Sequence, residues 1–114
     1  MKVRVDYEID DDLIRGEVGN ALDHGVSNWC ASVDTEDFPD GATYLSDIPS
    51  MGGTILMTTH DGDTHSLNLA KLKKGIRVMA RDYPWHFNDF IRGGGDCYTS
   101  DALIQCALFG KLIS

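Results

Sequence analysis

The residues best suited to chemistry in this sequence are carboxylates that gather in its first half. Residues 1–50 hold 12 acids and 3 bases, whereas residues 51–114 hold 6 acids and 7 bases. A concentrated negative surface can imitate a phosphate backbone and occupy the basic cleft of a nucleic-acid-binding protein, with electrostatic steering to speed the encounter. The alternative is that these are ordinary surface acids that favour solubility. The residues expected to bind a partner are Asp10, Asp11, Asp12, Asp34, Glu36, Asp37, Asp40 and Asp47.

A second candidate site is the aromatic segment 85–90, Trp-His-Phe-Asn-Asp-Phe. His86 and Asp89 are three residues apart, so on a helix the carboxylate could orient the imidazole as a general base. No nucleophile is identifiable nearby, because Thr99 and Ser100 precede an expected helix and such residues are usually caps. The aromatic side chains could instead pack in the core, or form a recognition surface.

A third candidate lies in a hairpin over residues 53–68, where Asp61-Gly62 fits a two-residue type I′ turn. That turn pairs Thr59 with Thr64 and places His60, Asp63 and His65 on one face. Two imidazoles and a carboxylate at this spacing could bind a metal ion. The alternative is an exposed polar turn, which is the more common arrangement, and no metal or other cofactor is expected.

The composition limits the domain organisation, the kinds of partner and the cellular location to be expected. With 114 residues, 42% of them hydrophobic, the chain is expected to form a single domain over residues 1–114. A net charge of -8 argues against direct binding to nucleic acid or to an anionic membrane, since both need cationic contacts. No apolar run approaches the length of a membrane span and the first residues do not resemble a secretory signal, so we expect a cytoplasmic protein.

The three cysteines have no zinc-site spacing and are an odd number, so structural disulfides are not expected. Cys106 lies in an apolar run that is typical of a buried helix.

The elements that position the acids are predicted by periodicity and capping. Alternating apolar and polar residues over 2–9 indicate a half-buried strand. Asp10, Asp11 and Asp12 suit the start of a helix over 11–24, although Gly16 and Gly19 weaken it or mark close approach of another backbone. A second strand follows over 28–33. The acidic residues 34–50 then form a long loop, because two prolines and a glycine interrupt any period.

The second half is predicted to be mainly helical after its hairpin. Asn68 caps a helix whose apolar positions recur at three- and four-residue steps, and Pro84 ends it. An aromatic helix over 85–91 ends at Gly93-Gly94-Gly95, and a last helix covers 101–109 with Thr99 or Ser100 as its cap. Residues 111–113 are a possible closing strand. The order predicts an α+β fold with an antiparallel sheet of four to five strands and three to four helices packed mainly on one face.

The C-terminal third contains His86-Phe87, Asp89, Asp96, Ser100-Asp101-Ala102 and the segment 105–110, Gln-Cys-Ala-Leu-Phe-Gly. In these residues it resembles small phage- and prophage-encoded proteins of unassigned function, with weaker likeness at Gly52-Gly53-Thr54 and 69–75. Lys111 after Phe109-Gly110 departs from the pattern. The resemblance implies a phage accessory protein, a class in which small acidic inhibitors of host defence, including anti-CRISPR proteins, are frequent.

These observations lead to one expected function and two alternatives. The expected function is a non-enzymatic inhibitor of a host nucleic-acid-binding protein or CRISPR effector complex that binds through the acidic residues of the first half. The first alternative is a small enzyme or a ligand-sequestering pocket protein built around His86 and Asp89. The second alternative is a structural phage component, which large symmetric assemblies would reveal.

Overall fold

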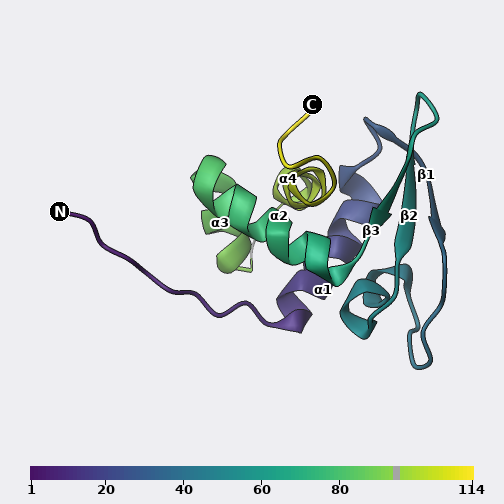
Figure 1. Cartoon of the computed structure of the whole chain (residues 1–114), viewed down its shortest axis with the longest axis horizontal. Coiled ribbons are helices and arrows are strands. Elements are labelled where there is room, and N and C mark those ends of the chain that lie inside the picture. The colour runs from purple at the N-terminus through teal and green to yellow at the C-terminus, as the bar shows by residue number, and fades with distance from the viewer. Residues whose placement is uncertain (94–95) are drawn as a thin grey trace.

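An antiparallel sheet forms one side of the molecule in the computed structural model, which describes residues 1–93 and 96–114 (Figure 1). Over these residues the sheet has three strands, β1 (Cys30–Thr35), β2 (Ile55–Thr59) and β3 (Thr64–Leu67), in the order β1-β2-β3. Side chains alternate along the central strand: Ile55 and Met57 are fully buried, whereas Leu56 and Thr58 are partly exposed. One face of the sheet therefore packs on the core and the other faces solvent.

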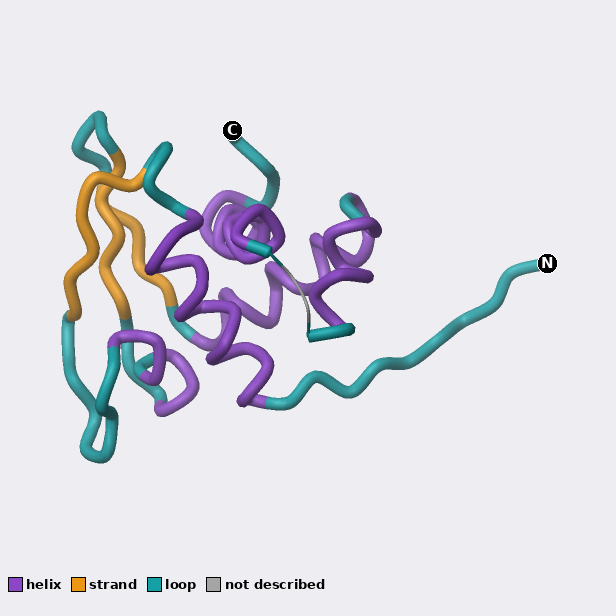
Figure 2. The backbone as a smooth tube through the Cα atoms, turned by 180° about the vertical axis from the view of Figure 1, so that it is seen from behind, coloured by secondary structure: helices purple, strands orange, loops and turns teal. Residues whose placement is uncertain are grey.

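The helices lie on one side of this sheet, as Figures 1 and 2 show from opposite directions. They are α1 (Asp11–Asn20), α2 (Leu69–Asp82), α3 (Pro84–Ile91) and α4 (Cys97–Phe109). A π-helical turn, η1 (Ala21–Gly25), extends α1, and two short 3₁₀ turns, η2 (Leu45–Asp47) and η3 (Pro49–Met51), precede β2. α3 packs on α2 and α4, at a distance from the sheet. The expected α+β class with helices on one face is confirmed.

Helix α4 forms the centre of the core because it is mainly apolar and its polar residues Thr99, Ser100 and Gln105 are buried as well. Residues 102–107 are buried without interruption, and α4 packs against α2, α3, α1 and β3. A helix without a polar face can be stable only when other elements cover every side of it. The predicted burial of Cys106 is confirmed, since its side chain is 1% exposed, and burial raises the pKa of its thiol to about 11.

Two predicted helix starts are confirmed by their caps. The Asp10 carboxylate accepts a hydrogen bond of 2.8 Å from the Leu13 amide at the start of α1. The Asn68 side chain accepts one of 2.9 Å from the Lys71 amide at the start of α2. Both satisfy amides that have no partner within the helix.

The predicted sheet of four to five strands is larger than the sheet found in the described part of the chain. Residues 2–9 are extended but pair with no strand there, and residues 111–113 form no strand. The closing residues are held by side chains instead: the Gln105 Oε1 atom accepts from the amides of Ile113 (2.7 Å) and Ser114 (3.2 Å), and the Tyr83 hydroxyl accepts from Leu112 (3.1 Å). Alternation fixes an extended backbone but does not supply a partner.

The predicted hairpin register is wrong by one residue. Three residues separate Thr59 from Asp63, whose backbone groups close the turn with a 2.8 Å hydrogen bond, and Gly62 adopts a positive φ of 95°. A three-residue turn with a left-handed glycine replaces the two-residue turn. Met57 consequently lies opposite His65, and Ile55 opposite Leu67.

The last helix begins earlier than predicted. Asp96 is its cap, and its Oδ1 atom accepts 3.1 Å hydrogen bonds from the amides of Tyr98 and Thr99. Thr99 and Ser100 are therefore buried inside α4. Gly93, the first glycine of the run expected to end the aromatic helix, follows α3 with a φ of 71°. The other two, Gly94 and Gly95, lie outside the described residues.

Over residues 1–93 and 96–114, none of the helices combines the length and the apolar composition that crossing a membrane requires.

Candidate functional site

Apart from Asp47, which lies in η2, the predicted acidic residues belong to two groups, one at the start of α1 and one at the end of β1 and in the loop after it. Asp11 and Asp12 are exposed in the first turn of α1, where the unpaired amides and the helix dipole favour negative charge. Asp34 lies on β1 opposite Leu56, on the solvent-facing side of the sheet. Glu36 and Asp40 are exposed in the loop that follows.

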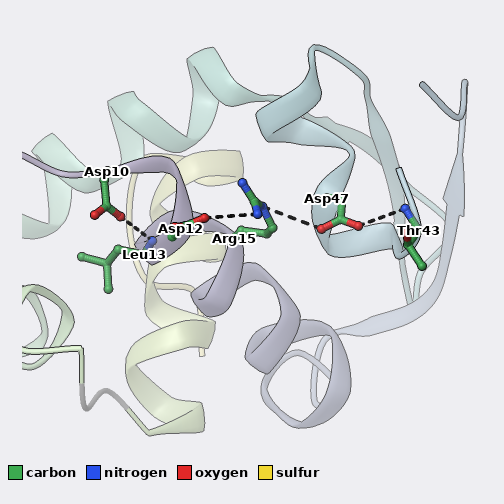
Figure 3. A network of polar contacts seen from close by, with 6 residues as sticks. All are labelled: Asp10, Asp12, Leu13, Arg15, Thr43 and Asp47. Atoms are coloured by element: carbon green, nitrogen blue, oxygen red, sulfur yellow. Dashed lines mark hydrogen bonds and ion pairs between the residues drawn. The ribbon is translucent and has the colours of Figure 1, made fainter. Parts of the chain in front are cut away.

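Arg15 links the group at the start of α1 to Asp47 in η2 (Figure 3). Its Nη1 atom lies 3.2 Å from Asp12 Oδ1 and its Nε atom lies 3.7 Å from Asp47 Oδ1. Asp47 Oδ2 also accepts hydrogen bonds from the amides of Tyr44 (2.9 Å) and Thr43 (3.0 Å). These amides, with a smaller contribution from Arg15, lower the pKa of Asp47. Asp47 is 18% exposed and ties η2 to α1.

The two groups lie at the same end of the molecule. α1 packs against η2 and η3, and Figure 1 shows the start of α1, these turns and the loop after β1 together at the lower end of the view. Asp37 holds this loop to β2, since its Oδ1 atom accepts a 3.0 Å hydrogen bond from the Thr54 amide. The exposed carboxylates at this acidic end are those of Asp10, Asp11, Asp12, Asp34, Glu36, Asp37 and Asp40.

His86 contacts a residue other than the one expected. Its Nδ1 atom lies 3.1 Å from Thr99 Oγ1 on α4, whereas Asp89 is exposed on α3. Thr99 is 1% exposed, so its hydroxyl is not open to a substrate. A pocket of about 260 Å³ opens beside His86, with Tyr98, Asp101 and Gln105 in its lining.

Asp101 in this pocket is occupied by structural contacts. Its two oxygens accept hydrogen bonds from Trp29 Nε1 (2.7 Å) and from Gln105 Nε2 (2.8 Å). Burial raises the pKa of its carboxyl group, although both hydrogen bonds and the charge of His86 act against that shift. The Asp101 carboxylate in this pocket is therefore already engaged, whereas His86, Tyr98 and Ser114 also line it.

A buried polar cluster that the sequence analysis missed connects α1 to α4. Ser100 Oγ donates to Glu17 Oε2 and accepts a 2.9 Å hydrogen bond from Asn20 Nδ2. Glu17 is 5% exposed, and burial raises its pKa despite the Ser100 hydrogen bond. Helical spacing could have revealed it, because Glu17 falls on the same face as Ile14 and Val18.

The proposed metal ligands of the hairpin have separate contacts. His60 Nε2 lies 3.2 Å from the Ser27 carbonyl oxygen, and the His65 ring packs edge-on against Phe109 at 4.9 Å. Asp63 is exposed in the turn. The shifted register separates the two imidazoles, and within the described residues no three His, Cys, Asp or Glu side chains form a group suited to a metal ion.

Comparisons of the chain with protein-family models, with curated proteins and with solved structures found no match.

Proposed function

We propose that this protein is a non-enzymatic inhibitor that binds the basic, nucleic-acid-binding cleft of a host defence complex of the CRISPR effector kind. The observation that carries the proposal is the convergence of the two acidic groups at one end of the molecule (Figure 1). Carboxylates from α1, from β1 and from the following loop face solvent there, although they are distant in sequence.

This acidic end has the features that electrostatic mimicry requires. The backbone beneath the charges is held in place, because Asp37 fixes the loop to β2 and Asp47 fixes η2 to α1 through Arg15. Exposed carboxylates on a fixed frame can present charges in a constant arrangement to a basic cleft, which favours rapid and selective association. The resemblance to phage-encoded proteins supports a host defence complex as the target.

The experiment compares two double charge reversals in an assay of nucleic-acid binding by purified CRISPR effector complexes. Glu36→Lys with Asp40→Lys changes the acidic end, and these side chains make no hydrogen bond or ion pair in the described structure. Asp63→Lys with Asp89→Lys is the matched control, because both residues are exposed and outside the acidic end. We expect the first variant to lose at least about tenfold in inhibitory affinity and the control to inhibit like the unchanged protein. Equal inhibition by all three proteins would refute the proposal.

The pocket beside His86 favours a second candidate function, the sequestration of a small polar ligand. Its lining combines the imidazole of His86 with the Tyr98 hydroxyl and the Gln105 amide. Its volume of about 260 Å³ lies just below the range typical of ligand pockets.

A further inference from the structure

Residues 1–9 form an extended segment that leaves the body of the molecule before α1 (Figures 1 and 2). More than half of the surface of each large apolar residue at its odd positions up to residue 7 is exposed: these are Met1, Val3, Val5 and Tyr7. They alternate with charged residues, so all of them lie on one face of an extended chain. A row of exposed apolar side chains on a strand-like segment indicates a surface that a partner covers.

We propose that this segment pairs with the same segment of a second copy of this chain, as an antiparallel ribbon centred on Val5. The dimer would be symmetric, since the same surface of each copy meets its equivalent about a two-fold axis. The proposal is independent of the acidic end, because it uses other residues and another kind of partner.

The charges of the segment select the partner and the register. With Val5 opposite Val5, Lys2 lies opposite Glu8 of the second copy and Arg4 lies opposite Asp6. Each of these ion pairs occurs twice in a symmetric dimer, and facing pairs of opposite charge stabilise antiparallel strands.

Neighbouring registers are less favourable. A shift that keeps the apolar residues on one face moves the pairing by two residues and places either Arg4 opposite Arg4 or Asp6 opposite Asp6. A shift of one residue places apolar side chains opposite charged ones. The sequence is therefore self-complementary in a single antiparallel arrangement.

A groove beside the segment provides space for the second copy. It has a volume of about 630 Å³ and runs between the segment and α2, with Ile14, Ile76, Ala80 and Phe87 in its apolar lining. Tyr7 already packs edge-on against Phe87, with ring centres 5.4 Å apart. In the proposed register, Met1 and Val3 of the second copy lie opposite Ile9 and Tyr7, beside the groove. Apolar side chains of the second copy would thereby leave water.

Two charge-reversed variants test the pairing by sedimentation equilibrium of the full chain. Lys2→Glu with Arg4→Asp makes the segment wholly acidic, and Asp6→Arg with Glu8→Lys makes it wholly basic. We expect the unchanged protein to be a dimer, and each variant alone to show a dimer dissociation constant at least about tenfold higher, since like charges then face each other. An equimolar mixture of the two variants should recover the dimer as a heterodimer, because every facing charge pair is again opposite.

A control variant tests whether the loss of the dimer is specific to the charges of residues 2–8. Asp63→Lys with Asp89→Lys changes the net charge elsewhere and should leave the dimer intact. Circular dichroism of each variant should match the unchanged protein, because the reversed residues are exposed and outside the core. A monomeric unchanged protein, an undiminished dimer in either variant alone, or a mixture that stays monomeric would each overturn the proposal.

Discussion

At the scale of single residues, Glu17 is the side chain whose position is energetically most demanding. A carboxylate that is 5% exposed has lost most of its hydration, and Ser100 compensates by donating a hydrogen bond. Burial nevertheless dominates and raises the pKa of Glu17 above its ordinary value of 4.5. The folded protein thus retains the Glu17 proton to a higher pH than the unfolded chain does.

Glu17→Gln should therefore stabilise the protein at neutral pH. As pH rises from about 4.5 through the raised folded pKa, the native state loses stability at this site, and the loss remains at higher pH. Glutamine keeps an acceptor for Ser100 without the charge. We expect thermal unfolding to show a higher midpoint for Glu17→Gln than for the unchanged protein at pH 7, and a smaller difference at pH 4. The exposed control Glu36→Gln should show no such change with pH. If the unfolding midpoint of Glu17→Gln lay below that of the unchanged protein by as much at pH 7 as at pH 4, a raised pKa of Glu17 in the folded protein would be contradicted.

At the scale of elements, the packing of α2 on α4 depends on one glycine. A Cβ atom on Gly75 would lie 2.6 Å from the Ala107 amide nitrogen and 2.7 Å from its Cα atom. Both atoms belong to the backbone of a buried helix, so they cannot move aside independently. The two helices therefore approach more closely than any other residue at position 75 allows. Gly16 in α1 is the opposite case, because a Cβ atom there would meet no other atom within 4 Å.

The same substitution at these two glycines should have opposite effects. Gly75→Ala should destabilise the protein by about 1–3 kcal/mol, because it overpacks the interface between α2 and α4. Gly16→Ala should stabilise it by about 0.5–1 kcal/mol, since alanine restricts the unfolded chain and is favoured in helices. Unfolding in urea measures both changes. Equal effects of the two substitutions would show that helix propensity alone, without the close approach, governs position 75.

At the scale of the whole molecule, charge is unevenly distributed. The first 50 residues carry 12 acids and 3 bases, and the start of α1 lies at the same end of the molecule as the loop after β1. Part of the positive charge of α2 lies elsewhere, since Lys73 and Arg77 line the groove beside residues 5–9. Under the proposed function, a partner with a basic cleft would approach the acidic end.

Ionic strength separates the two candidate functions. Attraction between exposed charges is screened over about 10 Å at 0.1 M salt and about 3 Å at 1 M. Affinity for a basic partner should fall at least about tenfold between about 0.05 M and 0.5 M salt. The Glu36→Lys and Asp40→Lys variant should show a shallower dependence. A salt-independent affinity for a small polar ligand would favour the pocket beside His86 instead.

The sequence by itself determined the features that depend on neighbours along the chain. The caps Asp10 and Asn68, the helix ended by Pro84 and the burial of Cys106 follow from local periodicity and capping chemistry, and each was predicted. The α+β class followed from the order of such elements, and the concentration of acids before residue 50 is a fact of the sequence.

Only the tertiary structure decided which distant groups meet. A left-handed Gly62 shifted the hairpin register and separated His60 from His65, and the Asp96 cap buried Thr99 and Ser100 inside α4. Tertiary packing also placed His86 against Thr99 and not in an ion pair with Asp89. It likewise brought Arg15 between Asp12 and Asp47. Alternation predicted a half-buried strand over residues 2–9, whereas these residues are extended and mostly exposed and pair with no strand in the described part of the chain. Periodicity specifies the conformation of a segment, whereas its partner depends on packing free energies summed over the whole chain.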